Sequence, residues 1–599
     1  MNAKAKMQKS KQGGVSVAML ILTMVISVVI GSYAYVSVSN QRLTQHAIAY
    51  MEAKIIAENA VALGTELFFQ KLKENKDLSD KDLLSMINQP DLKAEIMNVA
   101  ILNKDQLGYS MTGINFKLVR NGRINNLTVT AGTENEHTDT QVAIESKCSV
   151  QKKSILDYAY YVKGPFELFP APLMAVHGDV RCDGGIMRLS TVKGLSFDGK
   201  VWASDGLDVT DRNDITAISA SKRIAVNDLS GTPQNFYDEY NSVKLPLDSD
   251  HPNWDSKSVL RWGADMVRDD APSLEIPIDT EDTHLLIEPV DSNDSPSLKR
   301  EKISRVALKK HGITIKVDRN NTIWYKKGNG GFHKINPTTD EAIVTKTKDA
   351  NGVYTMTGDG WVSVDNTFVD KKETGKKVKL VNIYMDKLIQ RFENAKVVYI
   401  QVEDSKGSIK PYLEDRSVSM PAVRIRNGND LSAASEGITV ATHRLTYIEG
   451  NYNKKDKVPA LVAADNLKVL SNNWDDKNKS NSIASRIAKD TWYQMAVLVG
   501  GYEYQQSAPS GAIQGLQNLI RFPENWSKNK KTFHFLGSNV RLFASKETDS
   551  DAKGTYPPQR DVRYDEDLKN VSPPGTPDAF SAPEVTLWSS ISWKDVHWD

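Results

Sequence analysis

Cysteine is nearly absent from this sequence of 599 residues, in which Cys148 and Cys182 are the only two. Two cysteines are too few for a disulfide framework or for a zinc site built from cysteine pairs. In an oxidising compartment they would form one bridge, which closes a loop of about 35 residues and adds roughly 3 kcal/mol of stability. The alternative is a pair of buried free thiols, and the sequence leaves both possibilities open.

The chain also lacks an excess of charge of either sign. It contains 76 lysines and arginines and 75 aspartates and glutamates, so its formal net charge is +1. Proteins that bind nucleic acid or steer acidic substrates generally have a strongly basic balance. We therefore expect no nucleic-acid partner.

Signatures of catalysis are missing as well. The sequence has no Gly-x-Ser-x-Gly elbow, phosphate-binding loop, HExxH motif or paired CxxC, the patterns that place a reactive group or ligand set at a fixed spacing. An acidic cluster offers oxygen ligands that suit Ca²⁺, but its spacing matches no calcium loop, which favours a solvated turn. Its members are Asp205, Asp208, Asp211 and Asp214. We expect no cofactor, no metal and no catalytic residue.

A β-helical polysaccharide lyase or hydrolase is the enzymatic alternative. Hydrolysis of a glycosidic bond requires two carboxyl groups that converge on one face. Asp179, Asp183 and Asp198 lie beside or near glycines in turn-like positions, where aspartate is common for conformational reasons. Nothing in the sequence brings the three together, so we expect a non-enzymatic protein.

Charge is absent from one long stretch near the amino terminus. Lys4, Lys6, Lys9 and Lys11 precede about twenty-five uncharged, mostly apolar residues, and the next charge is Arg42. A helix rises about 1.5 Å per residue, so about 20 apolar residues cross a bilayer core of about 30 Å. The sequence predicts a transmembrane helix over 15–38. The lysines place its amino terminus in the cytoplasm and the rest of the chain on the far side.

A cleaved secretory signal peptide is the alternative interpretation. Its apolar core would be about 7 to 15 residues long and would end at a small-residue cleavage site. The apolar core of this chain is longer, and its end, Tyr33-Ala34-Tyr35-Val36, suits cleavage poorly. These features favour a retained anchor.

Proline is absent from the next segment, 39–72, and Gly64 is its only glycine. Apolar side chains recur there at spacings of three and four residues, which predicts an amphipathic helix that continues the membrane span for a total of about 55 residues. A separate second helix is the alternative. The predicted apolar stripe consists of Ile48, Met51, Ile55, Ile56, Ala60, Leu63 and Leu67.

The segment Lys11-Gln12-Gly13-Gly14, followed by the uncharged run from Val15 to Leu20, resembles the type III signal of prepilins. The resemblance implies that a prepilin peptidase cuts after Gly14, or alternatively after Gly13, and that Val15 becomes the methylated amino terminus. Major pilins carry a glutamate five residues into the mature chain, where this chain has Met19, or Ala18 on the alternative cut. This departure is similar to the PilX-type minor pilins and the GspK-like pseudopilins, and it favours a tip or initiating subunit.

Helix-to-helix packing in the membrane is the assembly mechanism that this resemblance implies. Small residues such as Gly31 and Ala34 allow two helices to approach closely. The expected packing positions are Val17, Leu20, Val25, Val28, Gly31 and Ala34. The implied partners are other pilins or pseudopilins, the peptidase and the inner membrane.

Beyond the helix, the periodicity changes to that of strands. Between 108 and 150 apolar residues alternate with polar ones, and Asn121-Gly122 marks a turn, which predicts an antiparallel sheet. A helix that lies on a small sheet is typical of a pilin head, and we assign 39–165 to that unit.

The remainder of the chain predicts a large β-rich body. Short strands between glycine turns over 166–225 and again over 416–545 are typical of a β-solenoid, in which each rung buries its face only against the next. The segment 226–415 between them is expected to form an α+β insertion. The runs ITVATHRLTYIEGNYN, PALVAADNLKVLSNNW, RFPENW and YPPQRDVRYDEDL resemble the carboxyl-terminal region of large PilX-type pilus assembly proteins.

The tail, 546–599, is rich in proline and tryptophan, with Trp588, Trp593 and Trp598 near its end. We expect a final strand that caps the open end of the solenoid. A surface for a partner subunit or a glycan is the alternative, since tryptophan favours interfaces.

Taken together, the sequence predicts an α+β protein: a leader (1–14), a transmembrane helix, a pilin-like sheet and a β-solenoid head. The expected function is that of a structural minor pilin in a type IV pilus or pseudopilus, at the bacterial inner membrane or on the cell surface. The alternative is a membrane-anchored adhesive protein whose head binds a surface glycan or another protein.

Overall fold

The computed structural model divides the chain into two compact units, residues 1–152 with 582–599 and residues 153–581. Within these units the structure describes residues 2–74, 80–101, 107–121, 124–170, 173–209, 217–274, 276, 282–291, 293–304, 312–335, 345–348, 354–357, 360–370, 377–501, 519–548, 556–580 and 584–591. For residues 2–18 the helical backbone alone is described.

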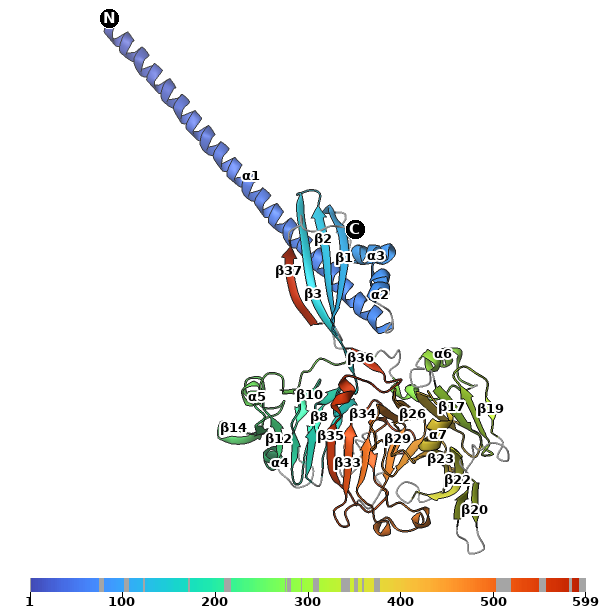
Figure 1. Ribbon diagram of the computed structural model, residues 1–599. Helices are drawn as coiled ribbons and strands as arrows, with labels where there is room; N and C mark the ends of the chain where they lie inside the picture. The colour runs from blue at the N-terminus through green and yellow to red at the C-terminus, as the bar shows by residue number, and fades with distance from the viewer. Residues whose placement is uncertain are drawn as a thin grey trace. The chain divides into compact units, whose positions relative to one another are not determined.

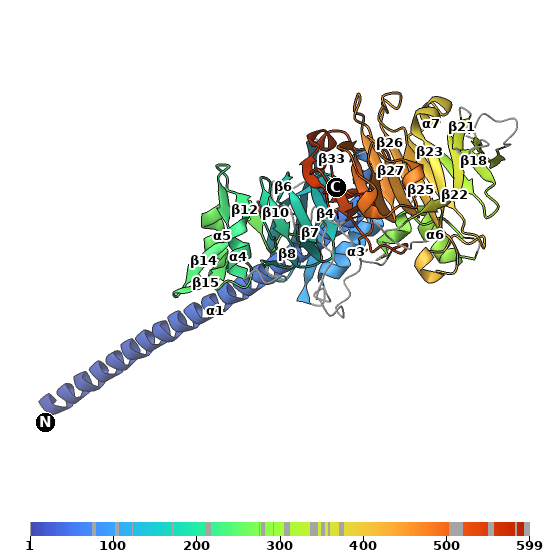
Figure 2. The same ribbon diagram turned by 90° about the horizontal axis from the view of Figure 1, so that it is seen from below.

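The first unit is built on one unbroken helix, α1 (Asn2–Glu74), of 73 residues. Figures 1 and 2 show it as a single coil that extends far beyond the sheet packed on its second half. The predicted continuation of the apolar span into a second, packed half is confirmed, because no proline interrupts the run of backbone hydrogen bonds. Two short helices follow, α2 (Asp80–Ile87) and α3 (Pro90–Ile101). Pro90 is the first residue of α3, where its missing amide hydrogen costs nothing.

An antiparallel sheet lies against this helix. Its main strands are β1 (Tyr109–Asn121), β2 (Ile124–Asn135), β3 (Thr140–Ser154) and β37 (Glu584–Ile591), and β36 (Asp578–Phe580) is assigned to the same sheet. The predicted period of two corresponds to β1, β2 and β3, which pair in sequence order.

The tail strand lies elsewhere than we predicted. We expected the tryptophan-rich tail to cap the solenoid, whereas β37 pairs antiparallel with β3 and completes the sheet of the first unit. The backbone of Trp588 lies opposite Ser146, and Trp593 and Trp598 lie outside the described residues. The second unit, 153–581, is therefore inserted between two neighbouring strands of one sheet.

The second unit consists mainly of parallel strands in three large sheets and a smaller one. The first sheet runs β16 (Val267–Arg268), β10 (Val201–Ala203), β7 (Val180–Asp183), β4 (Tyr160–Lys163), β34 (Asn539–Arg541), β31 (Ala496–Val499), β28 (Ala460–Ala464), β26 (Ile438–Thr442), β24 (Val397–Val402), β17 (Gly312–Val317), β18 (Ile323–Lys327) and β19 (His333–Lys334). The second runs β13 (Pro233–Asn235), β12 (Ile224–Asn227), β9 (Leu195–Phe197), β6 (Met174–His177), β35 (Gln559–Tyr564), β33 (Thr532–Gly537) and β30 (Thr491–Gln494).

The remaining sheets and helices complete this unit. The third large sheet runs β22 (Val362–Val369), β23 (Lys377–Tyr384), β25 (Met420–Arg426), β27 (Leu445–Glu449), β29 (Asn466–Leu470) and β32 (Ile520–Arg521), and the small one β11 (Leu207–Asp208), β8 (Met187–Leu189) and β5 (Phe166–Leu168). Two hairpins are β14 (Tyr237–Tyr240) with β15 (Val243–Pro246), and β20 (Thr345–Lys348) with β21 (Tyr354–Thr357). The helices are α4 (Ala217–Arg223), α5 (Trp254–Trp262), α6 (Pro296–Ser304) and α7 (Met385–Arg391).

Two distant parts of the chain meet in the middle of this unit. Strand β34 pairs parallel with β4, with Asn539 opposite Tyr160, and β35 pairs parallel with β6, with Val562 opposite Val176. Central strands such as β26, β28 and β31 are buried along their whole length, as expected of parallel strands covered on both faces. The β-rich architecture is thus confirmed, while the finer β-solenoid interpretation stays a prediction.

The segment 226–415, which we predicted as an α+β insertion, shares its sheets with the residues that follow it. Its strands β24 and β23 pair parallel with β26 and β25, so they extend the same two sheets. Strands β17, β18 and β19 then complete the end of the first sheet. The strand pattern of this segment was visible in the sequence, but the pairing partner of each strand was not.

Candidate functional site

The first half of α1 presents apolar side chains to the outside on every face. From Met19 to Val38 the described side chains are exposed almost without interruption, with Met19 at 69% and Tyr33 at 77% of full exposure. By length and composition α1 is able to cross a membrane, and its most apolar 18-residue window has a mean hydropathy of 2.1 and no buried residue. Exposed apolar area costs about 25 cal/mol per Å² in water, so this half of the helix is suited to lipid.

The predicted packing positions lie on this exposed half. Leu20, Val25 and Val28 are exposed by 60%, 53% and 67%, and Ala34 is also exposed. A Cβ atom built on Gly31 would have no neighbour within 4 Å, so the helix surface is open there. Within the described part of the first unit, these positions are free to contact lipid or a second helix. The side chains of Val15 and Val17 lie outside the described residues, and for Gly13 and Gly14 the helical backbone alone is described.

The second half of α1 is attached to the sheet by small residues. The buried stripe begins with Ala49, Ala53, Ala57 and Ala60, which recur at the spacings of one helix face. A Cβ atom on Gly64 would come within 3.0 Å of the Phe116 ring. Small side chains therefore let β1 and β2 lie close against the helix axis.

The stripe that we predicted is only partly the buried one. Ile56 and Ala60 are buried, and Leu67 is half-buried. In contrast, Ile48, Met51 and Ile55 are exposed by 54%, 57% and 52%, and Leu63 by 37%. The alanine spacing was the sequence signal that we overlooked, because we weighted large side chains over small ones. As a result, α1 keeps a second apolar face that its own sheet leaves uncovered.

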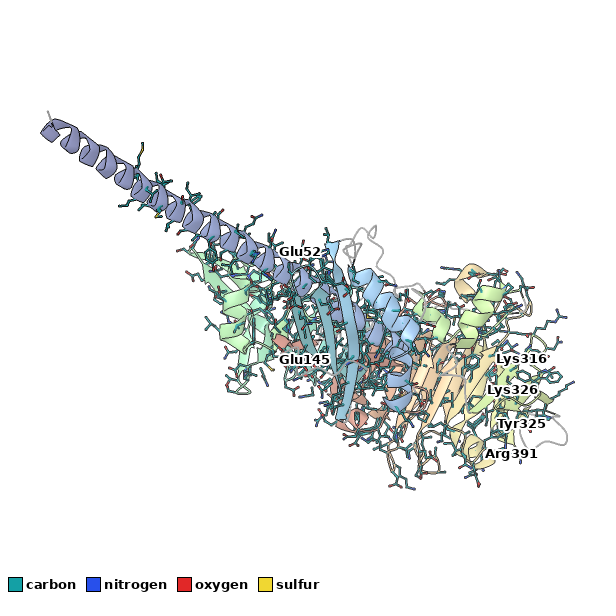
Figure 3. The ribbon with its side chains drawn as sticks, turned by 90° about the horizontal axis from the view of Figure 1, so that it is seen from above. Glu52, Glu145, Lys316, Tyr325, Lys326 and Arg391 are labelled. Atoms are coloured by element: carbon teal, nitrogen blue, oxygen red, sulfur yellow. The ribbon has the colours of Figure 1, made fainter. Side chains whose placement is uncertain are left out.

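One charged side chain also connects helix and sheet. The hydroxyl of Tyr109 on β1 donates a hydrogen bond of 2.6 Å to Glu52 on α1, and Figure 3 labels Glu52 on the helix where the sheet packs. Burial, and then the Glu52 carboxylate, raise the pKa of Tyr109 above its usual range. Tyr109 therefore remains a donor and fixes the helix relative to β1.

The two cysteines are buried free thiols in the structure. Cys148 belongs to β3 of the first unit and Cys182 to β7 of the second. Burial raises the pKa of both thiols, that of Cys148 to about 11. Both thiols are protonated at neutral pH, the form that reacts slowly.

The acidic candidates do not gather into a metal site within the described residues. Asp208 forms an ion pair of 3.3 Å with Arg188, and Asp205 accepts a hydrogen bond from Ser204. Asp211 and Asp214 lie outside the described residues.

The three aspartates of the enzymatic alternative have separate structural partners. Asp198 accepts from His177 at 2.6 Å, and Asp179 accepts from the backbone amide of Lys200. Asp183 is buried and bonds Arg181 at 2.9 Å. Each carboxylate therefore holds its own neighbouring strand or turn.

A cavity of about 550 Å³ in the second unit is lined in part by His284, which belongs to an unexpected buried histidine centre. The imidazole of His284 is 2% exposed and lies between Asp465 at 2.9 Å and Glu288 at 2.7 Å. The hydroxyl of Ser545 donates to Asp465 rather than to the imidazole, so the group lacks the serine–histidine bond of a nucleophile. His284 and Asp465 are 181 residues apart in sequence, so no local pattern predicts this pair.

This centre makes the stability of the second unit depend on pH. Burial alone would lower the pKa of His284, but its bonds to Asp465 and Glu288 raise it to about 9. The stabilisation is fully present below the unfolded pKa of about 6.5 and is lost as pH rises through 9. We expect the free energy of unfolding of the second unit to fall by roughly 3 kcal/mol between pH 6.5 and 9.

The measurement is urea denaturation of the full chain in detergent micelles at a series of pH values. His284→Gln keeps a polar group of similar size but does not titrate, so its pH slope should be flatter than that of the unmodified chain. Equal slopes in the two proteins would show that His284 is not the titrating group.

Comparison with known proteins gives little further information. No family profile matches the chain, and no curated protein matches it. Among solved structures, the chain is similar to the competence-associated pilin ComZ from Thermus thermophilus, at 8% identity over 81% of this chain and 83% of that chain, with a TM-score of 0.27. At such a score the two structures need not share a fold, and no conclusion is based on the likeness.

Proposed function

We propose that this chain is a minor pilin-type subunit: a membrane-anchored structural protein that joins a type IV pilus or pseudopilus through α1. The observation that supports this proposal best is the continuity of α1. One helix has an apolar half that is exposed on every face and a second half packed on an antiparallel sheet. A cleaved signal peptide would end before the folded protein begins. In this chain the apolar half of α1 continues without a break into the half that packs on the sheet.

Assembly would use the apolar surface that the first unit leaves uncovered. In lipid, helices associate through close van der Waals packing, and small residues such as Gly31 and Ala34 favour it. Beyond the membrane, the face that includes Ile48, Met51 and Ile55 would contact neighbouring helices of other pilins. Met19 stands where major pilins have a glutamate, which favours a place at the tip or in an initiating complex.

The remaining parts of the proposal follow from the amino terminus and from the size of the second unit. The lysines before the span favour a leader in the cytoplasm, with the sheet of the first unit and the whole second unit on the far side of the inner membrane. The head, a solenoid whose faces are the three large sheets, is displayed there or outside the cell. We infer a structural rather than an enzymatic role, which is supported by the separate structural partners of Asp179, Asp183 and Asp198.

Processing of the leader is the direct test. We expect that co-expression with a prepilin peptidase removes residues 1–14 and leaves a methylated Val15, which intact mass and amino-terminal sequencing would detect. Gly14→Ala should block the cut, whereas Gly13→Ala, a matched change one residue away, should not. The reverse pattern would place the cut after Gly13. An amino terminus unchanged by the peptidase would contradict the proposal.

The second candidate is a membrane-anchored glycan-binding protein that never enters a filament. The observation that favours it is a row of lysine and aromatic side chains in the second unit, in which Trp324 on β18 lies opposite Lys316 on β17 and Lys334 on β19. An unprocessed chain that stays in the membrane and binds a glycan would support this candidate over the first.

A further inference from the structure

The outer face of the hairpin strands at the end of the first sheet combines cations and aromatic rings. Lys316 on β17 lies directly opposite Trp324 on β18, and Trp324 lies opposite Lys334 on β19. The side chains of Ile313, Ile315 and Val317 are buried on the other face of β17, so the Lys316 side chain points outward. The indole is therefore flanked by a lysine on each neighbouring strand.

A second ring with its own cation lies next to this row. Lys326 is two residues after Trp324 and is therefore on the same face of β18. Its ammonium group lies 5.2 Å from the centre of the Phe332 ring, which is 43% exposed. Figure 3 labels Lys316 and Lys326 together at this end of the second unit. We call the set Lys316, Trp324, Lys326, Phe332 and Lys334 the lysine–aromatic face.

Trp324 is held in a fixed orientation. Its side chain hydrogen-bonds with Asp318, and the ammonium group of Lys334 lies 6.0 Å from the ring centre. Asp318 also accepts from the backbone amides of Asn320 and Thr322. A ring whose orientation is already fixed loses little entropy when a ligand stacks on it.

The face has a local excess of positive charge in a chain that is almost neutral. Lys316 is paired with Glu403 at 2.8 Å. Over the described residues, neither Lys326 nor Lys334 takes part in an ion pair, and both contact ring faces. Ammonium groups at partly exposed positions attract anions at modest strength that falls with salt.

We propose that the lysine–aromatic face binds an acidic polysaccharide. The apolar C–H face of a sugar ring would stack on Trp324, and carboxylates of neighbouring sugars would reach Lys326 and Lys334. Adjacent strands lie about 4.8 Å apart, which is close to the length of one pyranose unit, so the row from Lys316 to Lys334 matches consecutive sugars. Single-stranded nucleic acid fits less well, since it uses several rings for successive bases along a basic groove.

This inference does not depend on filament assembly. The face lies wholly in the second unit, and the test uses the full, unassembled chain in detergent micelles. A failure of leader processing would therefore leave the binding result unaffected. Likewise, a failure to bind polysaccharide would leave the proposed pilin role unaffected.

The experiment measures binding of the full chain to polygalacturonate, with dextran as a neutral polymer and oligo-dT as a nucleic acid. We expect the Lys326→Ala/Lys334→Ala double variant to weaken polygalacturonate binding at low salt by about tenfold. Trp324→Ala should weaken it at both low and high salt, whereas Lys326→Arg/Lys334→Arg should retain it. The matched control is Lys193→Ala/Lys244→Ala, which removes two exposed lysines from other elements of the same unit and should leave binding unchanged.

Three results would overturn the proposal. They are equal binding to polygalacturonate and dextran, an equal loss in the control double variant, and tighter binding to oligo-dT than to polygalacturonate. Thermal melting of each variant tests whether the second unit remains folded. Trp324→Phe, which keeps a ring, serves as a second variant if Trp324→Ala melts early.

Discussion

Deleting the tail strand β37 is expected to destabilise the first unit and to open the edge of β3. Residues 143–149 of β3 pair antiparallel with residues 584–591 of β37. Each ladder hydrogen bond contributes about 0.5–1.5 kcal/mol net, so truncation after residue 583 should cost on the order of 3 kcal/mol or more. The exposed edge of β3 would then be free to pair with another chain.

Hydrogen exchange of the full chain in micelles measures this effect. The β3 amides of residues 143–149 should lose protection in the chain that ends at residue 583, and sedimentation should show self-association. The matched control ends at residue 591, because it removes the final eight residues and keeps β37. Unchanged protection of β3 in the shorter chain would show that β37 is dispensable to the sheet.

The position of β37 has a consequence for how the head is held. The chain leaves the sheet of the first unit after β3 and returns to the strand beside it, with Ser149 opposite Glu584. Both ends of the second unit are therefore attached to neighbouring strands at one end of the same sheet.

The sequence predicted well what depends on local pattern. The uncharged run before Arg42 and the missing proline after it were enough to predict one long helix, because both conditions act on the helix backbone itself. The period of two over 108–150 likewise predicted β1, β2 and β3, whose neighbours in the sheet are their neighbours in the chain.

The sequence predicted poorly what depends on distant partners. Nothing near Trp588 indicates that its strand pairs with β3 rather than with the end of the body. The junction of β34 with β4 joins residues about 380 positions apart, as in the bond from Ser538 to the Tyr158 carbonyl. Parallel pairing is set by burial on both faces, and many apolar segments of this chain would satisfy that condition equally well.

The buried face of α1 and the lysine–aromatic face escaped prediction for a different reason. The alanines of α1 were visible at the correct spacing, but the close approach of a sheet rewards small side chains, whereas our stripe favoured large ones. The lysine–aromatic face depends on register: Lys316, Trp324 and Lys334 become neighbours only when two hairpin turns set which residues are opposite. Lysines and aromatic residues are common enough that their order along the chain carried no signal.

Asp183 provides a test between a structural and a catalytic carboxylate. Its side chain accepts from Arg181 at 2.9 Å, from the Tyr161 hydroxyl at 3.0 Å and from the Leu274 amide at 2.9 Å. Arg181 is itself 2% exposed and also donates to the Pro272 carbonyl. This network connects β4, β7 and the segment after β16 inside the second unit. The Arg181 and Asp183 positions, two apart on one strand, share a face, and that spacing was the available sequence signal.

Asp183→Ala is expected to lower the free energy of unfolding of the second unit by about 3–5 kcal/mol, because it leaves the Arg181 guanidinium buried without its carboxylate. Asp198→Ala is the matched control. Like Asp183, Asp198 lies near a glycine turn and pairs with a basic side chain, which in its case is His177. The Asp198 side chain is 43% exposed, however, and surface pairs contribute about 0–1 kcal/mol.

Urea denaturation in micelles, followed by tryptophan fluorescence, measures both variants, and polysaccharide cleavage is assayed in parallel. If Asp183 is structural, we expect Asp183→Ala to unfold at a lower urea concentration than the unmodified chain. We also expect the unmodified chain to cleave no polysaccharide. If the unmodified chain cleaves a polysaccharide, and Asp183→Ala abolishes that cleavage while unfolding at the usual urea concentration, Asp183 is a catalytic residue. The burial of Asp183 and its three partners argues for the first result, since a carboxylate that is 3% exposed and holds an arginine, a tyrosine and a backbone amide is closed to a substrate.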